Sequence, residues 1–145
     1  MVLVINMLFP KKVKYRKWQV GRVSEAKLAK PDTRGTAIAF GSFALKALSG
    51  GRIKTNQIES ARKALSHTLT KTSKVWIRIF PDRPYTAKPP EQGMGKGKGD
   101  PQGYCCEIRP GRLIFEVDGV EAAVAKEALR KAGTKLPVKT KVISR

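Results

Sequence analysis

The residues best suited to chemistry lie in a glycine-rich segment, Gly93–Gly99 (GMGKGKG), which carries Lys96 and Lys98. A phosphate-binding loop of the GxxxxGK[ST] type needs Ser or Thr after its lysine and then a helix, but glycine follows both lysines here. A dinucleotide-binding fingerprint needs GxGxxG between a strand and a helix, and the spacing does not fit. Two interpretations stay open: an extension that passes between RNA strands, or a flexible basic linker without a fixed partner.

The groups that a catalytic site would need are few and scattered. An RNA-modifying or RNA-cleaving enzyme would need a general base, a nucleophile or a metal cluster. The sequence offers one histidine, His67, two adjacent cysteines, Cys105 and Cys106, and two acids that flank the glycine-rich segment, Asp82 and Asp100. Adjacent strand residues point to opposite faces, so the cysteines form neither a CxxC metal clamp nor a disulfide framework, which fits a reducing cytoplasm. We therefore expect no enzyme, no metal and no cofactor.

The net charge is the most unusual property of the chain. Its 145 residues contain 30 Lys and Arg against 11 Asp and Glu, a formal net charge of +19. Self-repulsion on this scale opposes a compact state, and a polyanion such as nucleic acid relieves it. A membrane partner would usually require a basic amphipathic helix, a lipid anchor or an apolar run of roughly 20 residues, and we identify none of them. The composition predicts RNA as the partner and argues against a membrane.

Basic residues are concentrated before Glu25, in a segment without any acid. Tyr15 and Trp18 lie among them, and aromatic rings offer faces on which bases stack while basic side chains reach phosphates. We predict that this segment contacts RNA; the alternative is a solvated arm whose aromatic rings pack into the domain. Its cations are Lys11, Lys12, Lys14, Arg16, Lys17 and Arg22.

Periodicity predicts three elements before the glycine-rich segment. Gly35–Leu48 is predicted to be a strand that is interrupted at Gly41, and Lys74–Phe80 a second strand. Thr55–Lys71 is predicted to be a helix that Thr55 caps. Its buried stripe would be Ile58, Ala61, Leu65 and Leu69, with Arg62, Lys63 and His67 facing away.

Beyond a long loop over residues 81–103, Tyr104–Arg109 and Arg112–Val117 are predicted to form a hairpin that turns at Pro110–Gly111. Asp118 is expected to cap a second helix, and Gly133 to follow its last turn. A last strand is predicted over residues 137–143.

This order of elements predicts an α+β fold, a small antiparallel-sheet sandwich with two helices, a basic N-terminal arm and a long Gly/Lys-rich loop. The expected organisation is an extension over residues 1–9, the arm over 10–34, and a single domain over 35–145 that includes the loop 81–103.

One long segment, Trp76–Gly99 (WIRIFPDRPYTAKPPEQGMGKGKG), resembles the signature of the bacterial-type L-sixteen family of large-subunit ribosomal proteins. Five further blocks resemble the family in the family's own order, so that the resemblance covers most of the chain. These blocks are Pro10–Lys17, Phe40–Ala47, Gly51–Ala64, Phe115–Val120 and Leu136–Thr140.

The resemblance implies a non-enzymatic α+β protein of the ribosome in the cytoplasm, bacterial rather than organellar because no transit peptide is recognisable. Its implied partners are the large-subunit rRNA between the central protuberance and the peptidyl-transferase region, the aminoacyl-site tRNA and neighbouring ribosomal proteins, with no DNA. Three features depart from the family: Met1–Asn6 precedes the usual start, Val23–Thr33 is longer than usual, and Gly93 stands where arginine commonly precedes MGKGKG.

These considerations assign two groups of site residues. The expected rRNA-binding residues are Lys11, Lys12, Lys14, Tyr15, Arg16, Lys17, Trp18, Arg52, Lys54, Arg62, Lys63, Arg78 and Arg83. The loop expected near tRNA and the peptidyl-transferase region is Gly93, Met94, Gly95, Lys96, Gly97, Lys98 and Gly99. The alternative function is a free-standing basic RNA chaperone or RNA-processing factor, which would crosslink to many RNAs in cells rather than to a few fixed sites.

Overall fold

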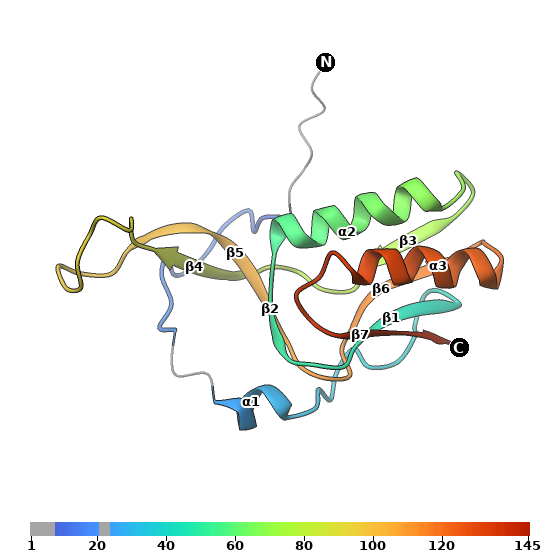
Figure 1. Ribbon diagram of the computed structural model, residues 1–145, viewed down its shortest axis with the longest axis horizontal. Coiled ribbons are helices and arrows are strands. Elements are labelled where there is room, and N and C mark those ends of the chain that lie inside the picture. Colours follow the sequence, from blue (N-terminus) through green and yellow to red (C-terminus); the bar gives the residue numbers. More distant parts are fainter. Residues whose placement is uncertain (1–7, 21–23) are drawn as a thin grey trace, which may run out of the picture.

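The computed structural model describes residues 8–20 and 24–145 and shows two antiparallel sheets with three helices, which confirms the α+β prediction (Figure 1). Met1–Asn6 and Arg22 lie outside the described residues. The four-stranded sheet has the order β3 (Lys74–Ile77), β6 (Leu113–Asp118), β1 (Phe43–Ala47), β7 (Thr140–Ser144). The three-stranded sheet has the order β2 (Gly51–Lys54), β5 (Asp100–Ile108), β4 (Arg83–Ala87).

Two helices, α2 (Thr55–Thr68) and α3 (Ala122–Gly133), lie side by side and form the layer over the four-stranded sheet (Figure 1). The core is packed between these layers and includes fully buried Leu45, Ile58, Leu65, Phe115 and Leu129. A short exposed helix, α1 (Glu25–Ala29), had no counterpart in the prediction. Within the described residues, no helix is long and apolar enough to cross a membrane.

The predicted apolar stripe of α2 is confirmed, because all four of its residues are buried. The predicted N-cap is wrong: the helix begins at Thr55 itself, and the backbone N–H of Lys54 donates to Gln57 Oε1 at 2.9 Å. The Thr55 hydroxyl lies within hydrogen-bond distance, 3.3 Å, of the carbonyl oxygens of both Leu8 and Tyr104. Thr55 therefore connects the start of the arm, the helix and β5.

The strand predicted over Gly35–Leu48 is wrong for its first half, since only Phe43–Ala47 pairs as β1. The N–H groups of Ala39, Phe40 and Gly41 bond to the side-chain carboxylate of Glu116 instead of a neighbouring strand. A Cβ at Gly41 would lie 2.6 Å from the backbone oxygen of Val117, so a close backbone contact requires glycine there. β3 likewise ends at Ile77, although Arg78 N still donates to Ile114 O at 2.9 Å.

The hairpin predicted at Pro110–Gly111 is also wrong. The turn itself exists, with Gly111 at φ +96°, and Arg112 N donates to Arg109 O at 3.3 Å. However, β5 pairs with β2 and β4, whereas β6 pairs with β1 and β3. The turn passes the chain from one sheet to the other, because turn residues specify a reversal and not the partner of the next strand.

The segment predicted as a loop over residues 81–103 contains two paired strands, over residues 83–87 and 100–103, which form an antiparallel ribbon. β4 pairs with β5 from Arg83 opposite Cys105 to Ala87 opposite Asp100, and the ribbon projects far from the two helices (Figure 1). Pro84 is compatible with β4 because this strand is the edge of its sheet. The loop prediction is correct for residues 81–82 and for residues 88–99, which form the irregular tip of the ribbon.

Two details of α3 and its surroundings differ from the prediction. Asp118 does not cap the helix; it accepts a 2.7 Å hydrogen bond from Ser42 Oγ at the end of β6, and the N-cap is Glu121. Gly133 is the last helical residue rather than the one after the helix. Packing explains why this residue is glycine, since a Cβ there would lie 2.5 Å from the Thr140 hydroxyl of β7. β7 itself covers Thr140–Ser144 and begins three residues later than predicted.

Candidate nucleic-acid interface

Residues 8–20, which include the start of the predicted arm and are called the arm from here on, cross the β4–β5 ribbon (Figure 1). Lys17 Nζ donates to the Lys98 carbonyl oxygen at 3.2 Å, and Lys98 Nζ donates in return to the carbonyl oxygen of Trp18. The arm and the glycine-rich tip, which are 81 residues apart in the sequence, therefore meet in one surface. The sequence assigned both segments to RNA but gave no reason to place them in contact.

Two of the predicted RNA-binding arginines hold the end of the arm against the smaller sheet. Arg83 Nη2 donates to the carbonyl oxygens of Gln19 and Val20 at 3.0 and 3.2 Å, and Arg52 donates to Val20 O at 3.4 Å. The Arg83 guanidinium also lies 5.6 Å from the ring centroid of Trp18. Arg52 and Arg83 both form ion pairs with one acid of β5, Glu107, at 3.1 and 2.7 Å respectively.

A third arginine, Arg78, pairs with the most buried acid of the protein. The Glu116 carboxylate is 0% exposed and accepts hydrogen bonds from Arg78 and from the backbone N–H groups of Ala39, Phe40 and Gly41. Burial alone would raise the pKa of Glu116, but these donors outweigh it and hold the pKa below its ordinary value. The Arg78 guanidinium in turn lies 5.1 Å from the ring centroid of Phe40.

On the predicted basic face of α2, one arginine is likewise paired with an acid, which reduces the positive charge of that face. Arg62 forms a forked pair with Glu59, at 3.0 and 2.5 Å, and this hydrogen bonding lowers the pKa of Glu59 despite partial burial. Lys54 lies 4.9 Å from the ring centroid of Tyr85. Lys63 and His67 are exposed, as predicted.

Three acids thus hold four of the arginines that the sequence assigned to RNA: Glu59, Glu107 and Glu116. Sequence reasoning missed these acids as anchors. The one available signal was that each of them directly neighbours a buried β-branched residue, Ile58, Ile108 or Val117. A charge that is paired inside the protein has less of its field left for phosphate.

The arm carries several cations whose charge is not paired with an acid. Lys11, Lys12, Lys14 and Arg16 are exposed, and none of them makes an ion pair with any residue that the structure describes. Tyr15 and Trp18 are 59% and 41% exposed, and Lys14 Nζ lies 5.5 Å from the ring centroid of Tyr15. Cations and stackable rings are therefore interleaved along one exposed segment.

The tip of the ribbon has an unusual backbone. Gly95, Lys96 and Gly97 have φ values of +96°, +56° and +89°, three left-handed residues in succession. A Cβ at Gly95 or Gly97 would contact nothing within 4 Å, so glycine serves the backbone conformation there and not packing. Met94, Lys96 and Lys98 are exposed, as is Gly93, which is also open to a side chain and has no left-handed φ.

Among residues 8–20 and 24–145, no three His, Cys, Asp or Glu side chains come together in a group that could hold a metal ion. The described site is instead an electrostatic surface, made of the arm, the ribbon and the tip.

A comparison of the amino-acid sequence with known families finds a match to the family described as ribosomal protein L16p/L10e. The match extends over residues 10–143, which include the arm, the ribbon, both sheets and all three helices.

Proposed function

The chain belongs to the ribosomal protein L16p/L10e family and is a structural constituent of the large ribosomal subunit, and from this premise we propose how it meets RNA. The arm binds large-subunit rRNA between the central protuberance and the peptidyl-transferase region, and the tip of the ribbon reaches toward the aminoacyl-site tRNA. Neighbouring large-subunit proteins are its other partners. The observation that carries the proposal is the contact between the arm and the tip through Lys17 and Lys98.

The arm is the main source of affinity in this proposal. Counterions are released when Lys11, Lys12, Lys14 and Arg16 neutralise phosphates, so each contact makes binding more sensitive to salt. Tyr15 and Trp18 add stacking faces between these cations. The arginines that are paired with acids shape the surface, and their ion pairs leave less of their charge to attract phosphate. They are Arg52, Arg62, Arg78 and Arg83.

The tip is the part that acts on tRNA. Lys96 and Lys98 are point charges on a backbone that bulky side chains do not cover. Replacing both lysines with alanine is expected to impair tRNA accommodation or late subunit assembly more than folding. A variant with Lys126→Ala and Lys135→Ala, which loses two exposed lysines elsewhere, is the matched control.

Sedimentation at increasing salt tests the proposal directly. The wild-type protein should co-sediment with large subunits and leave them only at high salt, and recovery free of ribosomes at physiological salt would contradict it. Replacing Lys11, Lys12, Lys14 and Arg16 with alanine should reduce the slope of log affinity against log salt by about 4, about one for each phosphate contact. The same number of exposed lysines replaced at Lys126, Lys135, Lys139 and Lys141 should change it little.

A further inference from the structure

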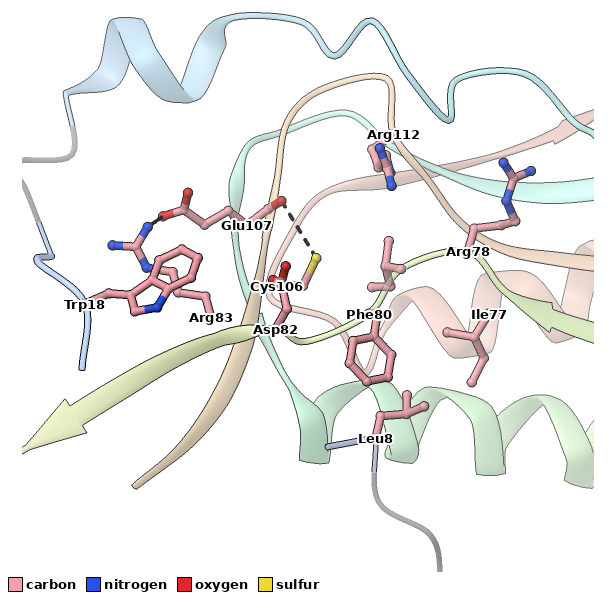
Figure 2. Close-up of a pocket in the computed structure, with 11 residues that line it drawn as sticks. Leu8, Trp18, Ile77, Arg78, Phe80, Asp82, Arg83, Cys106, Glu107 and Arg112 are labelled. Atoms are coloured by element: carbon pink, nitrogen blue, oxygen red, sulfur yellow. Dashed lines mark hydrogen bonds and ion pairs between the residues drawn. The ribbon is translucent and has the colours of Figure 1, made fainter. Parts of the chain in front are cut away.

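A cleft of about 520 Å³ lies between the arm, the strand connection that follows β3, and β5 (Figure 2). Two residues of the arm line the cleft, Leu8 on one side and Trp18 on the other. Its volume is in the range of small-molecule pockets rather than of packing defects. None of the roles proposed above uses this space.

The walls of the cleft are apolar and aromatic. Ile77, Ile79 and Leu8 are packed against the core and form the apolar side. Phe80 is 46% exposed and Trp18 is 41% exposed, although two such rings would normally be buried in a domain with space for them. Arg83 lies against the Trp18 ring and is itself fixed by Glu107, so the position of the indole is set in advance.

Three polar groups of the cleft are considered as ligand contacts: an acid, a thiol and the arginine with the most distant acidic partner. Asp82 is exposed and makes no hydrogen bond or ion pair with any described residue, which leaves its carboxylate able to accept from a ligand. Burial, with a smaller contribution from the Asp82 charge, raises the pKa of Cys106 to about 11, so this thiol is neutral at physiological pH. Arg112 Nη1 donates to the Arg34 carbonyl oxygen at 3.0 Å and lies 3.7 Å from Asp32, which leaves Nε and Nη2 as donors for an anion.

We propose that the cleft receives one unstacked nucleotide of the rRNA, with its base against Phe80 and Trp18, its amino group donating to Asp82 and its phosphate near Arg112. The proposal rests on the proposed function, since it assumes that the arm binds rRNA. Aromatic faces, a carboxylate that accepts from an exocyclic amine, and an arginine for phosphate are the groups that proteins use for splayed-out bases. An amine-bearing base, adenine, cytosine or guanine, is therefore favoured over uracil.

A nucleotide fits these groups better than a segment of a neighbouring protein. Three arginines line the cleft, Arg78, Arg83 and Arg112, and each of them is paired with an acid, so most of the attraction for an anion comes from the cations that precede Trp18 in the sequence and have no ion pair among the described residues. An incoming phosphate is attracted by this field, whereas a basic ribosomal segment is repelled. The experiment must therefore distinguish a nucleotide in the cleft from a segment of a neighbouring protein.

Chemical mapping of reconstituted subunits provides the test. Large subunits that lack this protein are supplied with wild type, Phe80→Ala, Phe80→Leu or Phe80→Trp, and every rRNA nucleotide is probed with dimethyl sulfate and a 2′-hydroxyl acylating reagent. We expect one unpaired nucleotide that wild type and Phe80→Trp protect and that Phe80→Ala and Phe80→Leu expose about 10-fold. The control is Phe40→Ala, which removes an exposed ring that does not line the cleft, 58% exposed against 46% for Phe80.

The identity of the base is tested with an rRNA fragment that carries uridine at the protected position. This change should weaken wild-type binding about 10-fold but leave the binding of Asp82→Ala nearly unchanged, because the acceptor is then already absent. Equal protection by wild type, Phe80→Ala and Phe80→Leu, or a crosslink from position 80 to a neighbouring protein, overturns the inference while the protein still sediments with subunits. Failure of the wild type to sediment at all overturns the proposed function instead.

Discussion

The ammonium group of Lys17 donates to the carbonyl oxygen of Lys98 at 3.2 Å, and Lys98 Nζ donates to the carbonyl oxygen of the residue that follows Lys17. This reciprocal contact joins an arm that has no regular secondary structure to the tip of a long ribbon. Neither segment has a core of its own, so each restricts the other. A ligand that fixes one of them should reduce the conformational freedom that the other loses on binding.

Removing the Lys98 side chain should release the arm. One hydrogen bond from a charged group contributes on the order of 1 kcal/mol, so Lys98→Ala should increase the rate of trypsin cleavage between residues 11 and 17 about fivefold. Lys96→Ala is the matched control because Lys96 makes no contact with the arm in the described structure. Equal cleavage rates in the two variants would show that the contact does not hold the arm.

Replacing the buried carboxylate should destabilise the whole domain. Glu116→Gln leaves Arg78 without its ionic partner and weakens the bonds to three backbone N–H groups, a loss of about 3 kcal/mol in the free energy of unfolding. Urea denaturation measures this change. The control, Glu127→Gln, removes an exposed ion pair on α3 and should cause no measurable change.

The same carboxylate makes stability depend on acid. The pKa of Glu116 in the folded protein lies below its ordinary value of 4.5, and the pKa of Glu59 is also lowered. Their stabilisation is complete above pH 4.5 and is lost as the pH falls through the folded pKa values. Urea midpoints measured from pH 7 to pH 3 should fall for wild type, and the difference between wild type and Glu116→Gln should shrink. A constant difference across this range would contradict the assignment.

Gly133→Ala should destabilise the protein although alanine is the better helix former. The new methyl would lie 2.5 Å from the Thr140 hydroxyl, on a stiff β-branched side chain in β7, and the expected cost is about 1–3 kcal/mol. The double variant Gly133→Ala/Thr140→Ala should recover most of this loss in thermal denaturation. Gly93→Ala, which meets nothing within 4 Å, is the control.

Gly93→Arg should add a cation at the tip of the ribbon. The position is open, exposed and free of left-handed backbone, so the substitution should leave the melting temperature unchanged. If the tip approaches RNA, the slope of log affinity against log salt should become steeper by about 1. An unchanged slope would place this part of the tip away from phosphate.

The elements that the sequence predicted well are those with a strong local pattern. The stripe of α2 follows the helical period, and the strand predicted over Arg112–Val117 contains a run of apolar residues that is buried from Leu113 to Val117 in β6. The errors occurred where partners are distant in the sequence. Glu116 satisfies the backbone of residues 39–41, which removes them from β1, and no local pattern signals a carboxylate 75 residues away.

The candidate site was predictable by composition but not by pairing. The sequence identified the arm and the Lys96–Lys98 tip, and it could not distinguish a free arginine from one held by Glu107. β4 was missed because Pro84 and the surrounding prolines suggest a loop, whereas an edge strand tolerates proline. The arm assignments themselves stay predictions for the experiments above.

The position of β6 between β3 and β1 also orders events in time. During synthesis, β1 and β3 leave the ribosome before the strand that pairs with both of them, because β6 begins only at Leu113. The basic arm is made first and needs no sheet to expose its charges. A nascent chain therefore presents its basic end long before its core closes. The core closes late because its contacts join residues that are far apart in the sequence, and such contacts form slowly.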